Sequence, residues 1–530
     1  MQINRQIWQA NRIASWLLLG VVWISWCESA LAATVTRGPY LQLGTPSSIV
    51  VRWRTDVPTD SQVQYGAAPG NLGFQANSSV MTNEHEITLS GLAPDSQYYY
   101  SVGTMATILA GNNADHFFIT FPPVGTPAPT RIWVLGDSGT ANAAAAAVRD
   151  AYFTATGSRH TDIWLMLGDN AYSDGTDAEY QNAVFNMYPT MLRKSVLWPT
   201  LGNHDGHSAD SSSQTGPYYS IFTLPKQGEA GGVASGTEAY YSFDFGNIHF
   251  ICLESFETDR SANGPMANWL RSDLAATRRD WIVAFWHHPP YSNGSHDSDT
   301  DIELIQMREN FLPILEAGGV DLVLGGHSHS YERSFLIDGH YGLSTTFNDS
   351  YKKDGGSGRD PTPYQKPAGL VSHQGAVYTV AGSSGQTAGG SLNHPAMFIS
   401  LNVLGSLILD FQTNRLDLSF LNSSGVVQDD FTIVKGASGP PPVPPVPTGL
   451  SAAPGDGRVA LTWNASSGAT SYNVKRSTTS GGPYTQIATG VTSTSYTDTI
   501  VVNGEIYYYV VSAVNAVGES PNSAQVSAIP

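Results

Sequence analysis

The chain has 530 residues, which is enough for three or four domains of ordinary size. Charged residues make up 13 % of it, about half of the usual share of roughly 25 %. The formal net charge of −18 argues against a nucleic-acid-binding protein, which normally has a basic face. It also argues against binding of anionic substrates, unless bound cations reverse the local field. The 53 glycines and 31 prolines, which lack the collagen period, predict a loop-rich extracellular protein with much β-structure.

The N-terminus predicts export. Two arginines precede an apolar run at 13–26, and the sequence Ala-Leu-Ala follows at 30–32. This order is typical of a secretory signal peptide, so we expect cleavage to remove residues 1–32 and the mature protein to be secreted or periplasmic. An uncleaved membrane anchor is the alternative, although the run is short for a bilayer. Cleavage would leave Cys252 as the only cysteine, and its apolar neighbours predict an inert core thiol.

Both ends of the mature chain predict β-sandwiches. Residues 34–122 and 448–530 contain short runs of alternating apolar and polar residues between Gly, Pro and Asn turns. Each segment has a tryptophan followed, 44 or 45 residues later, by a Tyr-rich run, and each resembles a fibronectin type III module. Residues 436–447 are rich in proline and predict an extended linker before the second module. The expected core aromatics are Trp53 with Tyr98 and Trp463 with Tyr507.

The middle of the chain, residues 131–435, has a different pattern. Apolar strand-like runs alternate with helix-like stretches, which predicts a layered α/β domain. Five of the runs lead directly into polar residues of the kind that bind metals, and such sites form beyond the carboxyl ends of strands. Carboxylate, amide and imidazole groups suit divalent or trivalent transition ions better than calcium. The five blocks are GDSG (136–139), GDNAY (168–172), GNHD (202–205), HHPPY (287–291) and GGHSH (325–329).

These five blocks, in this order, resemble the calcineurin-like metallophosphoesterases. Tyr172 in the second block is typical of their purple acid phosphatase branch, and YERS at 331–334 resembles the plant-type members. The resemblance implies an α/β fold, a four-layered α/β/β/α metallophosphoesterase sandwich, flanked by two all-β fibronectin III-like sandwiches. One departure is AGSSG at 381–385, where the family pattern has a glycine- and aspartate-rich turn.

The resemblance also implies two metal ions that share Asp169 as a bridging ligand. The ligands of an Fe(III) ion would be Asp137, Asp169, Tyr172 and His329. The ligands of a second ion, which would be Fe, Zn or Mn, would be Asp169, Asn203, His287 and His327. His288 is the alternative to His287. His204 and His296 would contact the substrate phosphate or protonate the leaving group, although His296 also fits a solvated loop histidine.

We therefore expect an exported acid phosphatase that hydrolyses phosphate monoesters by attack of a metal-bridging hydroxide. Two nearby ions would bind the phosphoryl oxygens and lower the pKa of the bridging water. A phosphodiesterase or nucleotidase on the same fold is the first alternative, and an inactive scaffold that binds surfaces is the second. The expected partner is a small phosphate ester, with no nucleic-acid-binding surface. The C-terminal module would act as a spacer or attach the enzyme to a polymer or cell surface, by analogy with similar modules.

Overall fold

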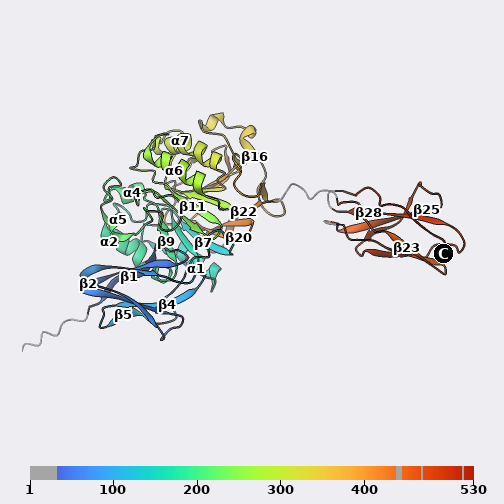
Figure 1. Ribbon diagram of the computed structural model, residues 1–530. Coiled ribbons are helices and arrows are strands. Elements are labelled where there is room, and N and C mark those ends of the chain that lie inside the picture. The colour runs from blue at the N-terminus through green and yellow to red at the C-terminus, as the bar shows by residue number, and fades with distance from the viewer. Residues whose placement is uncertain (1–32, 437–443, 467–468, 516–517) are drawn as a thin grey trace, which may run out of the picture.

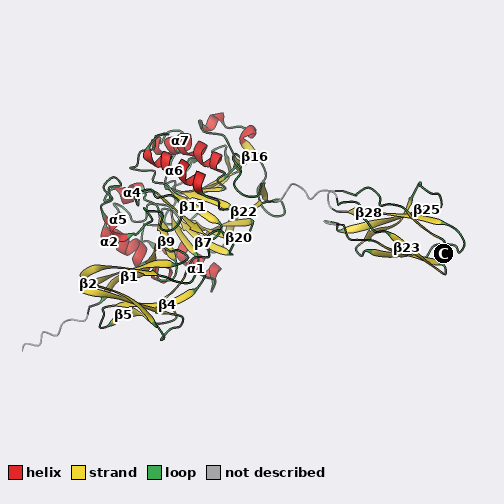
Figure 2. Cartoon of the chain, viewed as in Figure 1, coloured by secondary structure: helices red, strands yellow, loops and turns green. Residues whose placement is uncertain are grey.

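The computed structural model describes residues 33–436, 444–466, 469–515 and 518–530. The predicted signal peptide and most of the predicted linker lie outside these residues. Figure 1 shows an N-terminal β domain packed under an α/β region, and a second β domain that lies apart from both. Figure 2 shows that the helices gather in the α/β region. No helix in the described part of the chain is long and apolar enough to cross a membrane.

The N-terminal β domain is built around the long strand β2, which pairs with β1, β3 and β4. Trp53 on β2 is fully buried and stacks on His85, with ring centroids 4.6 Å apart. Tyr100 is the buried tyrosine of β4, whereas Tyr98 is only partly buried. The strands are β1 (Val35–Gln42), β2 (Ser48–Gly66), β3 (Phe74–Ser90), β4 (Gln97–Gly103), β5 (Ile108–Gly111) and β6 (Phe117–Ile119).

The N-terminal β domain and the α/β region share one continuous core. Strand β1 provides several of the polar contacts between them, and Arg54 of β2 adds two hydrogen bonds to Asp177. The fully buried guanidinium of Arg37 lies 2.9 Å from Asp177 Oδ1 and donates to Gln181 Oε1 at 2.8 Å. The Tyr40 hydroxyl donates to the carbonyl of Ile221 at 2.8 Å. Because a buried arginine is costly without partners, these contacts fix the β domain against the α/β region.

The first sheet of the α/β region has the order β17-β22-β21-β20-β7-β8-β9. Its strands β7, β8 and β9 are parallel neighbours, so their carboxyl ends lie side by side. These three ends lead into the first three sequence blocks. Helix α1 (Ala143–Thr156) contacts β20 and β21. The strands are β7 (Thr130–Leu135), β8 (Ile163–Met166), β9 (Val196–Pro199), β17 (Tyr364–Lys366), β20 (Gly405–Gln412), β21 (Arg415–Asn422) and β22 (Val427–Lys435).

The second sheet has the order β10-β11-β12-β13-β18-β14-β19 and leads into the last two blocks from its parallel strands β12 and β13. It meets the first sheet where β18 contacts β20. Cys252 on β11 is buried, which confirms its predicted place in the core, and this burial raises the pKa of its thiol to about 12. The strands are β10 (Tyr241–Phe245), β11 (Ile248–Cys252), β12 (Trp281–Phe285), β13 (Leu322–Gly325), β14 (Tyr331–Ser334), β18 (Val377–Ala381) and β19 (Met397–Leu401).

Helices α6 (Pro265–Ala276) and α7 (Ile302–Gly318) contact each other and are the longest helices after the second sheet begins. The prediction of an α/β region with additional β domains is confirmed. The shorter elements are α2 (Asp177–Tyr180), η1 (Gln181–Phe185), α3 (Pro189–Leu192), α4 (Asn203–Gly206), α5 (Pro217–Ile221), β15 (Leu336–Ile337), η2 (Ser344–Thr346), η3 (Asp349–Tyr351) and β16 (Lys352–Asp354).

The C-terminal β domain has a core of its own, in which Trp463 and Tyr507 are both buried. Between its described residues and the rest of the described chain there is no hydrogen bond or ion pair. Its three- and four-stranded sheets contain β23 (Ser451–Gly455), β24 (Arg458–Thr462), β25 (Ser471–Ser477), β26 (Thr485–Val491), β27 (Ser495–Asp498), β28 (Tyr507–Val514) and β29 (Val526–Ala528).

A buried histidine in β11 makes the stability of the α/β region depend on pH. Both ring nitrogens of His249 face carboxylates, Asp244 Oδ1 and Asp273 Oδ2, each at 2.8 Å. Burial lowers the pKa of His249, but the hydrogen bonds and charges of the two carboxylates outweigh it and raise this pKa to about 9. Because the folded pKa exceeds the unfolded value of about 6.5, the stabilisation is complete below pH 6.5 and is lost as the pH rises through 9.

We therefore expect the free energy of unfolding to fall by roughly 3 kcal/mol between pH 6 and pH 9.5, at 1.36 kcal/mol per pKa unit. Urea unfolding of the wild type and of His249→Gln at a series of pH values tests this. The variant is less stable at pH 6, and its free energy of unfolding should fall by roughly 3 kcal/mol less than that of the wild type over the same range. An equal decline in both proteins would show that another group titrates.

Candidate metal centre

Three of the five loops that follow the strands turn sharply at a ligand-type residue. Asp137, Asp169 and His327 have φ angles of 55°, 51° and 64°, in the left-handed region that few non-glycine residues adopt. The close packing of the loops also requires glycine. A Cβ on Gly168 would lie 2.5 Å from Nδ1 of His287. The glycine in the second block therefore lets the first sheet's loop lie directly against a histidine of the second sheet.

The first group of side chains surrounds the hydroxyl of Tyr172. This oxygen lies 2.9 Å from Asp169 Oδ2, 3.2 Å from Asp137 Oδ1 and 3.3 Å from His329 Nε2. Both carboxylates are buried. One hydroxyl proton is thus shared among three atoms that can accept it. The carboxylates and the imidazole have ligand atoms within 4.8 Å of one another, a spacing that could hold a metal ion.

The second group surrounds Nε2 of His287. This atom lies 3.4 Å from Asp169 Oδ1, 3.1 Å from Asn203 Oδ1 and 3.2 Å from Nδ1 of His327. The Nδ1 atom of His287 donates to the carbonyl of Leu167 at 2.8 Å. Since a carbonyl only accepts, Nδ1 carries a proton, and Nε2 is the ring nitrogen that faces the other ligand atoms. Asp169 therefore reaches the first group through Oδ2 and the second through Oδ1.

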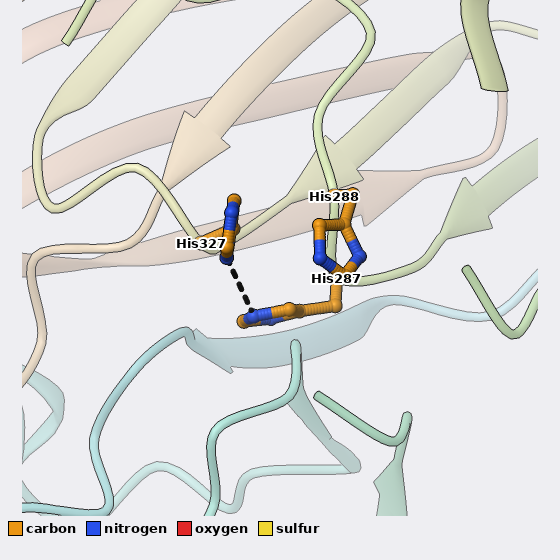
Figure 3. Close-up of side chains that lie close together, drawn as sticks. All are labelled: His287, His288 and His327. Carbon is orange, nitrogen blue, oxygen red and sulfur yellow. Dashed lines mark hydrogen bonds between the residues drawn. The ribbon is translucent and has the colours of Figure 1, made fainter. Parts of the chain in front are cut away.

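His288 also lies near this group, as Figure 3 shows. Its ring centroid is 4.2 Å from that of His327, but its Nδ1 lies 2.8 Å from the hydroxyl of Ser255. Burial, together with the charge of neighbouring His287, lowers the pKa of His288 well below the usual value. The contacts to Asp169 and Asn203 are made by His287, so the geometry favours His287 as the ligand.

The electrostatics of the two groups fit bound cations. Burial, together with the charges of Asp137 and Asp169, raises the pKa of Tyr172 far above its ordinary value. Burial would also raise the pKa of Asp169, but His287 and the backbone N–H of His204 hold it below the usual range. Two buried carboxylates that face each other need a positive partner. Hard oxygen donors on one side and imidazoles on the other are a donor set that transition ions accept.

The two outer histidines lie beside these groups. His204 has its Nε2 3.9 Å from Asp169 Oδ2, and its Nδ1 donates to the carbonyl of Ser173 at 2.6 Å. The ring of His296 is 3.7 Å from that of His327, and its Nδ1 lies 2.8 Å from Asp301 Oδ2. The structure thus brings His296 to the centre instead of leaving it in a remote solvated loop. All nine residues that the sequence singles out lie in this cluster.

Three neighbouring residues have no counterpart in the sequence prediction. Asp205 is fully buried and accepts hydrogen bonds from Gly202 N, Asn170 N and Asn170 Nδ2, and from the hydroxyl of Tyr180. It thereby ties the loop of the second sequence block to that of the third. Gln386 directly follows the AGSSG turn, which differs from the family pattern. Its Nε2 lies 3.3 Å from His329 Nε2. His207 lies beside His204. Asp205 is the last residue of the GNHD block, and this position is the sequence feature that could have identified it.

Comparison with known proteins agrees with this geometry. Residues 130–331 match the family model for calcineurin-like phosphoesterases, and residues 36–119 match that for the N-terminal domain of purple acid phosphatases. The matched part of the chain, residues 36–331, is purple acid phosphatase-like and belongs with the calcineurin-like phosphoesterases. The family consists of hydrolases, which agrees with the predicted enzyme class.

Individual relatives cover parts of the chain. Purple acid phosphatase 15 of Arabidopsis thaliana is 30 % identical over 284 residues, which are 47 % of this chain and 49 % of that protein. The match therefore spans about half of the relative's length. The structure of purple acid phosphatase PPD1 from yellow lupin superposes with a TM-score of 0.57 at 18 % identity, covering 76 % of this chain and 75 % of that one. The structure of PhoD gives a TM-score of 0.54 at 12 % identity, covering 75 % and 90 %. Both structures show a shared fold.

Proposed function

We propose that this protein is an exported two-metal acid phosphatase that hydrolyses phosphate monoesters. The observation that carries the proposal is the position of Asp169, whose two carboxylate oxygens face two different groups of ligand atoms. The four-layered α/β/β/α order of the catalytic region, at 131–435, is part of the same proposal. So is the fibronectin type III identity of the two β domains, at 34–122 and 448–530.

Two overlapping sets of side chains would hold the ions. For Fe(III), the set is Asp137, Asp169, Tyr172 and His329. For a second ion of Fe, Zn or Mn, the set is Asp169, Asn203, His287 and His327. When bound, two such ions neutralise the charge of the phosphoryl group and activate water for in-line attack. The chain has a net charge of −18, so its own field would otherwise repel a phosphate ester.

The outer histidines would position the substrate and supply a proton. The Ser173 carbonyl accepts from Nδ1 of His204, which directs Nε2 toward the centre. When the ring carries a second proton, Nε2–H can donate to a phosphoryl oxygen or protonate the departing alkoxide. Asp301 orients His296 in the same way, through Nδ1. General acid catalysis of this kind contributes typically 10²–10⁴-fold to a rate.

A substrate panel with metal analysis tests the proposal. The full mature chain, loaded with iron and zinc, is assayed with 4-nitrophenyl phosphate and bis(4-nitrophenyl) phosphate at pH 5 and pH 7. We expect two metal ions per chain and a kcat/KM at least tenfold higher for the monoester. Equal or faster turnover of the diester would favour the phosphodiesterase alternative. Two bound ions without hydrolysis of either ester would favour the inactive scaffold.

The colour of the iron-loaded protein tests the role of Tyr172. A phenolate bound to Fe(III) gives a charge-transfer band in the visible range, so we expect a purple or pink protein. Tyr172→Phe should lose this band and keep measurable turnover, because the other ligands remain. Visible absorption spectra and initial rates of the two proteins, at matched iron content, provide the measurement. A band that persists in Tyr172→Phe would place the chromophore elsewhere.

We also propose that the C-terminal β domain attaches the enzyme to a polymer or cell surface. Its separate core and the proline-rich segment before it support an independent module. Truncation after Lys435 should change kcat/KM for 4-nitrophenyl phosphate less than twofold and reduce retention on insoluble polymers. A drop of more than tenfold in the correctly metallated enzyme would show that the domain contacts the active site.

A further inference from the structure

A histidine outside the predicted set lies on the outer side of His204. His207 directly follows the short helix α4, and its ring centroid is 5.3 Å from that of His204. The His204 ring is in turn 4.6 Å from that of Tyr172. The three rings form a row that begins at the first group of ligand atoms. The side chain of His207 is 46 % exposed, so the outer end of this row is open to solvent.

Two consecutive residues of one loop orient both histidines. The Ser173 carbonyl lies 2.6 Å from Nδ1 of His204, and Asp174 Oδ1 lies 3.2 Å from Nδ1 of His207. Carbonyl and carboxylate oxygens only accept here, so each Nδ1 carries a proton. Within the described chain, no group forms a hydrogen bond with Nε2 of His207. The loop thus holds both rings by Nδ1 and leaves Nε2 of His207 available for a ligand.

The loop that orients these rings is itself fixed. The Glu179 carboxylate accepts hydrogen bonds from the backbone N–H groups of Ser173, Asp174 and Thr176, at 2.6, 3.2 and 2.9 Å. It also accepts one from the Thr176 hydroxyl at 2.8 Å. Such a set of charge-assisted hydrogen bonds restricts the loop, and with it the Asp174 side chain. A prepositioned group binds a ligand at a smaller entropic cost than a freely rotating surface side chain.

We propose that His207 binds a second phosphoryl group of the substrate, located on the leaving group beyond the phosphoryl group at the metal centre. This inference rests on the proposed phosphatase function. The Asp174 carboxylate accepts from Nδ1 of His207, and when the ring also carries a proton on Nε2, this Nε2–H can donate a charge-assisted hydrogen bond to an anionic oxygen. In an acidic chain, such a local donor offsets the repulsion of a dianionic leaving group. The substrate class is therefore a phosphoester or phosphoanhydride that carries two phosphoryl groups.

A binding experiment tests this subsite without relying on turnover. The metal-loaded full chain is titrated calorimetrically with propane-1,3-diphosphonate and with propylphosphonate, which differ only in the second phosphonate group. His207→Phe keeps a ring against His204 but has no nitrogen. We expect the wild type to bind the diphosphonate more tightly than propylphosphonate. In His207→Phe the ratio of the two Kd values should fall about tenfold, which corresponds to the loss of one charge-assisted hydrogen bond. Binding of propylphosphonate should change less than twofold.

Two further variants serve as a graded test and a control. Asp174→Asn still accepts from Nδ1 but removes the charge, so the preference should fall by about threefold. His373→Phe removes another exposed histidine, 49 % exposed, whose Nδ1 lies 3.1 Å from an aspartate, Asp338. It should leave both affinities unchanged.

Several results would overturn the subsite: no preference for the diphosphonate in wild type, no binding of either phosphonate, or an unchanged preference in His207→Phe. The phosphatase proposal fails separately. If the preference depends on His207 but the metallated protein hydrolyses no phosphate ester, the subsite stands and the proposed function does not. If hydrolysis occurs and the preference is unchanged, the proposed function stands and the subsite does not.

Discussion

Asp169→Asn should deprive the protein of both metal ions and reduce phosphate ester hydrolysis by more than 100-fold. Asp169 Oδ2 lies 2.9 Å from the Tyr172 hydroxyl, and Asp169 Oδ1 lies 3.4 Å from Nε2 of His287. The substitution keeps the shape of the side chain but removes its charge and replaces one oxygen by an NH₂ group. Loss of an outer partner of a metal ligand already costs 10–100-fold in metal affinity or activity, so loss of a shared ligand should cost more.

Elemental analysis of the purified variants, beside initial rates on 4-nitrophenyl phosphate, measures both effects. Asn203→Ala is the matched control, because Asn203 contacts only the second group, through Nε2 of His287 at 3.1 Å. It should lose the second ion and keep the first. Two full metal equivalents in Asp169→Asn would refute the shared-ligand assignment.

Much of this centre could be predicted from the sequence because each candidate ligand follows its strand almost directly. Asp137 lies two residues beyond the end of β7, and Asp169 three residues beyond the end of β8. The position of each side chain is then determined by local backbone geometry and by neighbouring parallel strands. The same argument explains why the α/β class of the region was predictable from the alternation of strand-like and helix-like runs.

Contacts between distant loops could not be predicted in this way. The pairing of β20 with β7 joins residues more than 270 positions apart, such as Leu407 and Val134. Gln386 reaches His329 from a turn with no recognisable ligand pattern. Nε2 of His287 faces the candidate ligand atoms because the Leu167 carbonyl accepts from Nδ1 of the same ring. Sequence order contains none of these hydrogen bonds.

The Trp53–Tyr98 spacing selected a tyrosine that packs against the core without being fully buried. Tyr98 and Tyr100 lie on the same face of β4, since they are two residues apart. Tyr98 lies nearer the start of the strand, where its hydroxyl accepts from Ala93 N and its ring stacks on Phe118. It is therefore only partly buried, whereas Tyr100 is fully buried. Alternation predicts on which face of a strand a side chain lies. How deeply that side chain is buried also depends on the loops that cover each end of the strand.

The buried carboxylate of Asp205 should prove essential for both stability and metal binding, although we do not propose it as a ligand. In Asp205→Ala, the N–H groups of Gly202 and Asn170 and the Tyr180 hydroxyl lose their acceptor inside the protein. Each buried donor left without a partner costs about 1–3 kcal/mol, so the free energy of unfolding should fall by roughly 3 kcal/mol or more. Release of the loops at 168–172 and 202–205 should also weaken metal binding by 10–100-fold.

Urea unfolding of the metal-free proteins and competition with a chelator for the metal-loaded proteins measure these two effects separately. Asp210→Ala is the control, because Asp210 caps a turn close to Asp205 but its contacts, to Ser212 and Ser213, are exposed. It should lose less than about 1 kcal/mol, as typical for a surface hydrogen bond. Asp205→Asn keeps one acceptor oxygen and should fall between the two. If Asp205→Ala retained wild-type stability and two tightly bound ions, the loops would hold their geometry through other contacts.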